Sequence, residues 1–256
     1  MEFLALSDIH GNITAVERLC KEVKNKKFDA IICAGDIGNS LESCREIVDI
    51  FSSLDAPFLY VLGNGDDFEF NKKIGNNAIH LHLNPFFVKN YVFLGYSGTA
   101  ANYYGANPSL KEIKSGHIDY YKGLKIMSEA RKIRRKELNE VVEKKGLDGK
   151  NIILISHERA GICNLDFTPI MHIFGHIHKK GFKICNGIPY LNVAELDDCD
   201  RTTKSYNKNG GFYCVIKLFK DDFKYKFYQI KKRYYKLYNL NYYDLFPTNS
   251  IHFDSK

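Results

Sequence analysis

Short apolar runs alternate with helical patterns over the first 62 residues of this 256-residue chain. Residues 3–6, 30–33 and 58–62 have the composition of buried strands. Between them, a helix from about residue 14 and another near residues 41–51 carry apolar side chains on one face. Strand–helix–strand units of this spacing cross over in a right-handed sense and form a buried parallel sheet. The alternation therefore predicts an α/β fold.

The remainder of the chain is predicted to contain one long helix and several more strands. Residues 86–96 have the pattern of a hairpin, and residues 97–123, which are polar and rich in tyrosine, predict an excursion over the surface that is a candidate cover for a site. A helix follows, with one apolar face formed by Ile126, Ala130, Ile133, Leu138, Val141 and Val142. Further strands are expected at residues 151–155 and 171–174 and in four later segments, GFKIC, IPYLNVA, GFYCVIKLF and FKYKFYQ.

The domain organisation follows from length and from one change in composition. A chain of this length is expected to form one domain, and only after about residue 230 does the composition change, to a segment dense in Lys, Arg and Tyr. We predict a domain over residues 1–230 and a basic, tyrosine-rich extension over residues 231–256. The extension suits either packing and oligomer formation or stacking on single-stranded nucleic acid.

Composition points to a reducing, cytoplasmic setting. The seven cysteines are scattered with no C-x-x-C pair, which argues against a disulfide framework or a zinc ribbon. The first residues lack the apolar core of a signal peptide, and no run approaches the roughly 20 apolar residues of a membrane span. The net charge of +7 either steers an anionic substrate or reflects a general bias toward lysine.

Five predicted strands are each followed by side chains that can bind a metal ion. The five segments are Ser7-Asp8-Ile9-His10, Gly35-Asp36, Gly63-Asn64, Ser156-His157 and Gly175-His176-Ile177-His178. Open α/β sheets build their sites at the carboxyl ends of strands, and residues i and i+2 of an extended segment project to one side. We therefore expect these side chains to converge on one site.

The donor set indicates transition metals. Two aspartates, one asparagine and four histidines offer mixed oxygen and nitrogen ligands, which suit Mn, Fe, Zn, Ni or Co better than Ca. Two such ions about 3.5–4 Å apart hold a hydroxide between them and clamp the attacking and leaving oxygens of an in-line displacement. The expected cofactor is a pair of divalent ions, manganese first.

The ordered set D-x-H, GD, GN, H and GHxH resembles the calcineurin-like metallophosphoesterase superfamily, and within it the Icc-related branch of small phosphoesterases. The resemblance spans residues 3 to about 195. It implies a four-layer fold of two packed β-sheets flanked by helices. It also implies Asp8, His10 and His178 on the first metal, Asn64, His157 and His176 on the second, and a bridging carboxylate from Asp36.

Two departures from the family pattern concern the substrate. Most members have a histidine after Gly-Asn that helps to protonate the leaving group, and here Gly65 stands in its place. Asp66 or Asp67 would replace that acid only with a pKa raised by burial. Where many relatives have a small residue and two prolines, Glu158-Arg159 follow His157; Arg159 is a candidate phosphate contact, with a surface ion pair as the alternative. Asn12 is a second candidate phosphate contact.

The predicted function is a dinuclear metal-dependent phosphodiesterase with a metal-bridged hydroxide nucleophile. The expected substrate is a small phosphodiester or a nucleotide, and nucleic acid is a further candidate partner. The alternatives are a nuclease or nucleotide pyrophosphatase on the same site, and a metal-binding scaffold without turnover. Outside the motifs, we expect ordinary packing or exposure for His80 and His82, no particular partner for His172, and a solvated helix face for the basic run at residues 131–136.

Overall fold

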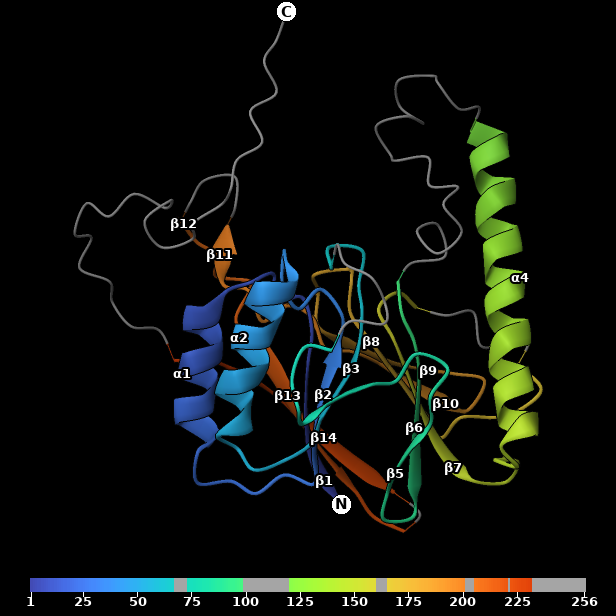
Figure 1. The fold of residues 1–256 in the computed structure, drawn as a ribbon, viewed down its shortest axis with the longest axis horizontal. Coiled ribbons are helices and arrows are strands. Elements are labelled where there is room, and N and C mark those ends of the chain that lie inside the picture. Colours follow the sequence, from blue (N-terminus) through green and yellow to red (C-terminus); the bar gives the residue numbers. More distant parts are fainter. Residues whose placement is uncertain (67–72, 99–119, 160–164, 201–204, 221, 232–256) are drawn as a thin grey trace, which may run out of the picture.

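A computed structural model describes residues 1–66, 73–98, 120–159, 165–200, 205–220 and 222–231 of the chain (Figure 1). Two six-stranded sheets form its centre, and a two-stranded ribbon of β11 (Cys199–Asp200) and β12 (Ser205–Tyr206) accompanies them. The predicted surface excursion lies mostly outside these residues, as does the extension after residue 231. No helix in the described part of the chain is long and apolar enough to cross a membrane.

The first sheet has the strand order β14-β13-β1-β2-β3-β4. Its strands are β1 (Glu2–Leu6), β2 (Ala30–Ala34), β3 (Phe58–Val61), β4 (Ala78–His80), β13 (Phe212–Leu218) and β14 (Phe223–Gln229). The strands β1, β2 and β3 run parallel, as the alternation with helices predicts, and β4 adds a fourth parallel strand that was not predicted; β13 joins the edge of β1 in the antiparallel sense. The crossover helices are α1 (Ile13–Val23) and α2 (Leu41–Ser52).

The second sheet has the order β5-β6-β7-β8-β10-β9. Its strands are β5 (Phe86–Val88), β6 (Tyr91–Tyr96), β7 (Asn151–Ser156), β8 (Met171–Phe174), β9 (Gly181–Cys185) and β10 (Ile188–Asn192). The strands β6, β7, β8 and β10 are parallel, and β5 pairs with β6 in the predicted hairpin. The long helix α4 (Tyr120–Lys144) connects β6 to β7.

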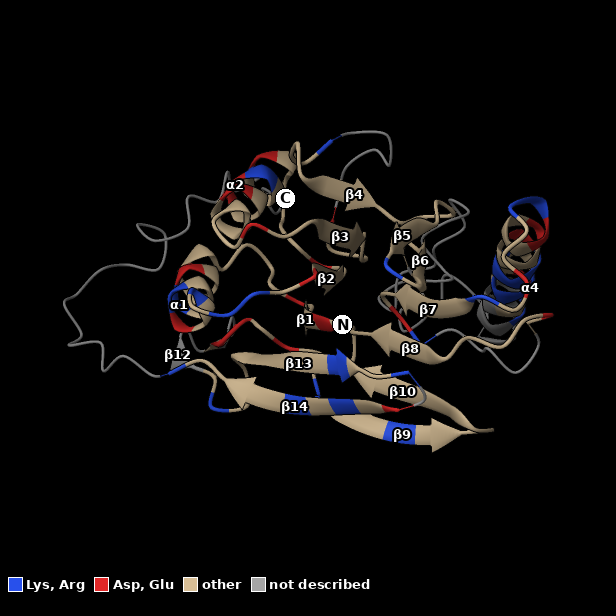
Figure 2. Ribbon diagram, turned by 90° about the horizontal axis from the view of Figure 1, so that it is seen from below, with Lys and Arg blue, Asp and Glu red and all other residues tan. Residues whose placement is uncertain are grey.

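Three apolar layers hold the sheets and helices together. Along β1, Leu4 and Leu6 pack toward α1 and α2, while Phe3 and Ala5 pack against the second sheet, because side chains alternate across a strand. A third layer joins the far face of the second sheet to Leu138 of α4. In Figure 2, α1 and α2 lie on one side of the paired sheets and α4 on the other. The predicted fold of two packed sheets flanked by helices is confirmed.

The face that α4 turns to the sheet differs from the prediction in one turn. Ile133, expected on the apolar face, is 37% exposed, and the neighbouring Arg134, expected in a solvated basic run, is 2% exposed. Arg134 lies over the ring of Tyr96, 4.8 Å from its centroid, and forms an ion pair with Glu158. The carboxylate of Glu158 and the face of the Tyr96 ring compensate the cost of burying the guanidinium. Arg134 therefore packs against the sheet at this turn, where the apolar periodicity predicts Ile133.

Candidate metal centre

Hydrogen bonds of backbone amides hold the strand-end loops together within each sheet and join the loops of one sheet to those of the other. The Asp8 amide donates to the Gly35 carbonyl at 3.0 Å, and the Ile9 amide donates to the Asp36 carbonyl at 2.8 Å. In the second sheet, the Gly175 amide donates to the His157 carbonyl at 2.9 Å. The His176 amide then reaches across to the first sheet and donates to Asp8 Oδ2 at 3.0 Å. The loops after β1, β2, β7 and β8, which are far apart in sequence, therefore form one continuous rim at the carboxyl ends of these strands.

The backbone at this rim is strained. Nine non-glycine residues in the described part of the chain have positive φ, and five of them are predicted metal ligands: Asp8, His10, Asp36, His176 and His178. Such angles are uncommon outside glycine and cluster at functional sites, where the surrounding structure enforces them. The rim thus fixes its side chains in directions that an ordinary turn would not give.

Two glycines make the close approach of the loops possible. A Cβ at Gly35, which has φ of +91°, would lie 2.7 Å from Nδ1 of His157. A Cβ at Gly175 would collide with Oγ of Ser7 and would lie 2.5 Å from Oδ2 of Asp8. The glycines before Asp36 and His176 are thus required by the space that the neighbouring loop occupies.

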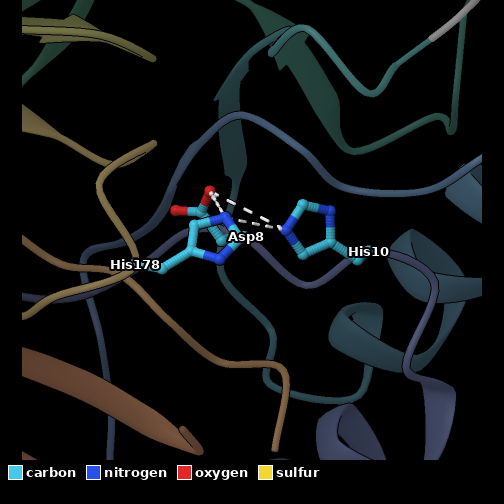
Figure 3. A group of neighbouring side chains, drawn as sticks. All are labelled: Asp8, His10 and His178. Atoms are coloured by element: carbon cyan, nitrogen blue, oxygen red, sulfur yellow. Dashed lines mark hydrogen bonds and ion pairs between the residues drawn. The ribbon is translucent and has the colours of Figure 1, made fainter. Parts of the chain in front are cut away.

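One group of donors consists of Asp8, His10 and His178, whose ligand atoms all lie within 4.8 Å of one another (Figure 3). The two imidazoles face each other through their Nε2 atoms at 3.2 Å. Asp8 Oδ1 lies 3.2 Å from Nε2 of His178 and 3.9 Å from Nε2 of His10. Asp8 itself is fully buried and accepts a short hydrogen bond from the Ser7 hydroxyl.

The second group of donors consists of Asp8, Asp36 and His157, again within 4.8 Å. His157 Nε2 lies 3.5 Å from Asp36 Oδ1 and 3.0 Å from Asn64 Oδ1. The His176 ring stands edge-on to that of His157, with 5.0 Å between centroids. All seven predicted ligands therefore lie at the same rim, although His176 and Asn64 stand at its exposed side.

The hydrogen bonds of His157 show that this rim suits a cation. Its Nδ1 lies 2.8 Å from the carbonyl oxygen of Ala34, which only accepts hydrogen bonds, so Nδ1 carries a proton. In the neutral ring, the Nε2 lone pair then faces two oxygen acceptors, those of Asn64 and Asp36. Three acceptors that converge on one point require a proton or a metal ion between them, and the donor types match a divalent transition metal.

The pKa values at the rim are consistent with a cation-binding arrangement. Burial opposes the charged form of both His157 and Asp36, yet their mutual hydrogen bond and attraction raise the pKa of His157 to about 9 and lower the pKa of Asp36. Hydrogen bonds with Asp8 and then Glu195 raise the pKa of His178 to about 10. Positive charge is thus favoured at both donor groups.

Comparison with known proteins identifies the family. The sequence profile of the calcineurin-like phosphoesterases matches residues 1–180. The chain belongs to this family. No curated protein sequence matches the chain significantly. The resemblance drawn from the five motifs is therefore confirmed, and the chain is assigned to a family of metal-dependent phosphoester hydrolases.

Solved structures share the fold of this calcineurin-like phosphoesterase at low sequence identity. The protein TT1561 of Thermus thermophilus is 14% identical with a TM-score of 0.58, and the match covers 88% of this chain and 97% of that one. A dimetal phosphatase from Danio rerio is 11% identical with a TM-score of 0.57, covering 89% and 95%. GAP50, described as the anchor in the inner membrane complex of Plasmodium, is 15% identical with a TM-score of 0.50, covering 91% and 85%.

At the third motif of this calcineurin-like phosphoesterase, Asp66 fastens two loops together. Its Oδ1 accepts hydrogen bonds from the Ile37 and Gly38 amides at 2.8 and 3.0 Å, and its Oδ2 accepts one from the Gly63 amide at 2.7 Å. Burial raises the pKa of Asp66 to about 6. That Asp66 acts as the acid stays a prediction; Asp67, its alternative, lies outside the described residues.

The two predicted phosphate contacts differ in their surroundings. The Asn12 side chain is 5% exposed: its oxygen caps α1 by accepting from the Ala15 amide at 3.0 Å, and its amide donates to Asp197 at 2.7 Å. Arg159 is exposed, and its guanidinium lies over the ring of Tyr190 at 4.7 Å. Asn12 is thus a buried residue that caps a helix, whereas Arg159 is an exposed residue stacked on an aromatic ring.

Sequence reasoning missed two residues that contact the predicted ligands. Glu195 Oε1 lies 3.0 Å from Nδ1 of His178, and Ser7 donates to Asp8. Glu195 follows β10 in the segment VAELDD, so a sixth strand also delivers a carboxylate to the rim. An acidic run directly after a predicted strand was the available signal.

Proposed function

We propose that this calcineurin-like phosphoesterase is a dinuclear metal-dependent phosphodiesterase. Asp8, His10 and His178 would hold the first ion, and Asn64, His157 and His176 the second, with Asp36 between them. The proposal assigns hydrolysis of a P–O bond in a small phosphodiester or a nucleotide. The proposed substrates are phosphodiesters rather than phosphomonoesters.

The position of Asp36 is the observation that carries the proposal. Its two oxygens face one histidine from each proposed site: Oδ1 lies 3.5 Å from Nε2 of His157, and Oδ2 lies 3.7 Å from Nδ1 of the His10 ring. The Gly65 amide donates to Oδ1 at 2.7 Å and fixes the carboxylate plane. A buried carboxylate that lies between His157 and His10 supports the assignment of Asp36 as the bridging ligand.

The residues of the rim and its surroundings would have different roles in the reaction. Two divalent ions, when bound, would activate a water molecule and neutralise charge on the phosphate. The strained rim holds the ligands before substrate arrives, so that little reorganisation accompanies the reaction. Arg159, exposed two residues after His157, would bind a non-bridging phosphate oxygen through its planar fork. For Asn12, whose amide is engaged by Asp197, we propose support of the α1 loop.

The preference for diesters rests on Gly65. With no side chain there, the leaving alkoxide receives no proton from the position that carries histidine in most of the family. Loss of such an acid costs about 10²–10⁴ in rate for poor leaving groups. Aryl diesters, whose leaving groups depart without a proton, would be favoured.

The test starts from metal-stripped protein reloaded with Mn²⁺ or Ni²⁺. We expect hydrolysis of bis(p-nitrophenyl) phosphate in the loaded protein and none above background in Asp36→Ala or His176→Ala. A panel of monoesters, nucleotides and single-stranded nucleic acid then identifies the substrate, and salt-sensitive cleavage of nucleic acid would indicate a nuclease. Equal rates with chelator and with metal would exclude the enzyme and favour a scaffold.

Gly65→His examines the missing acid directly. We expect it to raise the rate for alkyl leaving groups selectively, leaving activated aryl diesters unchanged. A Cβ at position 65 would lie 3.2–3.3 Å from the Asp36 carboxylate, so Gly65→Ala is the matched control for crowding. If both variants behave alike, the diester preference has another origin.

The identity of the metal and the cellular location of the protein are proposed from the sequence. Manganese is proposed from the mixed nitrogen and oxygen donor set. A cytoplasmic setting is proposed from cysteine usage; the six cysteines within the described ranges are all free.

A further inference from the structure

We propose that Glu195 is a positioning residue that orients His178 and makes the group of Asp8, His10 and His178 the tighter of the two metal sites. The inference rests on the proposed dinuclear site. It concerns a residue outside the segment that matches the family profile, which ends at residue 180.

Glu195 contacts the nitrogen of His178 that points away from the donor group, so that Nε2 is the nitrogen presented to a metal. Glu195 Oε1 lies 3.0 Å from Nδ1 of His178, so the ring donates its Nδ1 proton to the carboxylate. Nε2 is then directed toward Asp8 Oδ1, 3.2 Å away, and toward Nε2 of His10. His178 is 44% exposed and has no dense packing to fix its ring, so the carboxylate supplies that constraint.

Glu195 is itself firmly held. Its side chain is 9% exposed, and its Oε2 accepts a hydrogen bond from Asn207 Nδ2 at 3.3 Å. The Phe212 amide donates to its backbone carbonyl at 2.8 Å. The next two residues are fastened to the strand end that carries Asp8: the Leu196 amide donates to the Ser7 carbonyl and the Asp197 amide to the Asp8 carbonyl, both at 3.0 Å. The segment of Glu195 is therefore hydrogen-bonded directly to the strand end that carries Asp8.

At the second metal site, the buried histidine His157 has a backbone carbonyl, and not a carboxylate, behind its ring. There, Nδ1 of His157 lies 2.8 Å from the neutral carbonyl oxygen of Ala34. A carboxylate behind a ligating imidazole raises the basicity of the ring more than a carbonyl does, and loss of such a partner weakens metal binding about 10–100-fold. Two sites with similar ligands would therefore fill in order, the site of His178 first.

The experiment measures metal binding without substrate. Metal-free full-length protein is titrated with Mn²⁺ by calorimetry, and free Mn²⁺ is followed by electron paramagnetic resonance. We expect two sites of unequal affinity in the wild type. Glu195→Ala should weaken the tighter site about 10–100-fold, and Glu195→Gln, which keeps the shape and a hydrogen-bond acceptor, about tenfold. The weaker site should change little in either variant.

A double-mutant cycle separates positioning from general damage. His178→Ala should remove the tighter site, and adding Glu195→Gln to it should have no further effect, because the carboxylate acts through that ring. Asp198→Asn is the matched control: this carboxylate lies in the same segment but pairs with Arg18, and its loss should leave both affinities unchanged. Nitrogen NMR of the Zn²⁺-loaded protein should show His178 protonated at Nδ1 and metal-bound at Nε2.

The outcomes distinguish the inference from the proposed function. Two bound ions with an unchanged tighter site in both Glu195 variants would overturn the inference and leave the dinuclear site standing. An effect of Glu195→Gln that persists in the His178→Ala background would also overturn it. A wild-type protein that binds fewer than two ions would defeat the proposed function itself, and the inference with it.

Discussion

His157, which follows β7, and His172, which lies in the neighbouring strand β8, are both fully buried, yet their surroundings favour different protonation states. The pKa of His157 is raised to about 9, because the hydrogen bond and charge of Asp36 outweigh its burial. The pKa of His172 is lowered to about 3 by burial and by the nearby guanidinium groups of Arg134 and Arg159.

The difference comes from where each side chain leaves the sheet. His157 follows the end of β7 and turns into the rim, where carboxylates from the first sheet meet it. His172 lies within β8 and points to the α4 face, where its Nε2 is 2.7 Å from the Ser156 hydroxyl and it packs on Phe174. Burial alone thus does not predict the charge of a histidine; the sign of its neighbours does.

The largest expected effect separates the two histidines by function. His157→Gln should reduce turnover of an aryl phosphodiester about 10²–10³-fold, because loss of a metal ligand removes several kcal/mol of charge stabilisation. His172→Gln, which can keep a hydrogen bond to Ser156, should stay within about threefold, less than 1 kcal/mol of barrier. Turnover at saturating metal, together with the metal content measured by mass spectrometry, checks both variants. Similar losses of turnover in the two variants would contradict the predicted difference between the two histidines.

The next effect concerns the cation that faces His172. Arg134→Met should lower the free energy of unfolding by about 3 kcal/mol, because it removes the buried cation that lies 2.9 Å from the carboxylate of Glu158, which is only 13% exposed. The matched control is Lys132→Met on the same helix: its pair with Glu129 is exposed to solvent, so its loss should change stability much less. Urea unfolding measures both, and equal losses would show that Arg134 contributes no more than a surface charge.

The smallest effect is the pH dependence of stability. A histidine with an unfolded pKa near 6.5 and a lower folded pKa binds protons preferentially when unfolded, so its contribution is complete above about pH 6.5 and is lost as pH falls toward the folded value. For His172, with a folded pKa of about 3, we expect a loss of about 2 kcal/mol between pH 7 and pH 5.

His172→Gln should remove that part of the acid sensitivity. The comparison uses chelator-treated protein, so that the rim histidines titrate alike in both samples. His82, whose pKa is lowered to about 4 by burial and by its neighbours His80 and Arg134, remains in both and sustains a residual slope. Parallel stability curves for wild type and variant would mean that His172 does not stay neutral in the folded state.

The predicted ligands could be placed at one rim from the sequence because each of these side chains comes just after a predicted strand. Asp8, Asp36 and His157 each come at the end of an apolar run, and parallel strands bring such ends to one edge. The expectation of ordinary packing or exposure for His80 is consistent with its stack on Tyr60, 4.9 Å between centroids.

Residues that depend on strand order could not be placed in this way. Glu195 meets His178 because β10 lies beside β8 although β9 comes between them in sequence. Arg134 is buried because Glu158 and Tyr96, from two different strand ends, reach the same turn of α4. A local pattern carries no information about partners that are brought together by the sheet.

The sequence by itself determined the fold class, the family and the donor types, because these depend on periodicity and on which side chains follow each strand. Only the tertiary structure decided how those donors are oriented and charged. The carboxylate partner of Nδ1 of His178 and the proton on Nδ1 of His157 each depend on a contact about 3 Å long from another part of the chain. The neutrality of His172 depends on its burial and on two guanidinium groups from other elements. Electrostatic effects on that scale depend on distance and direction, which the order of residues does not contain.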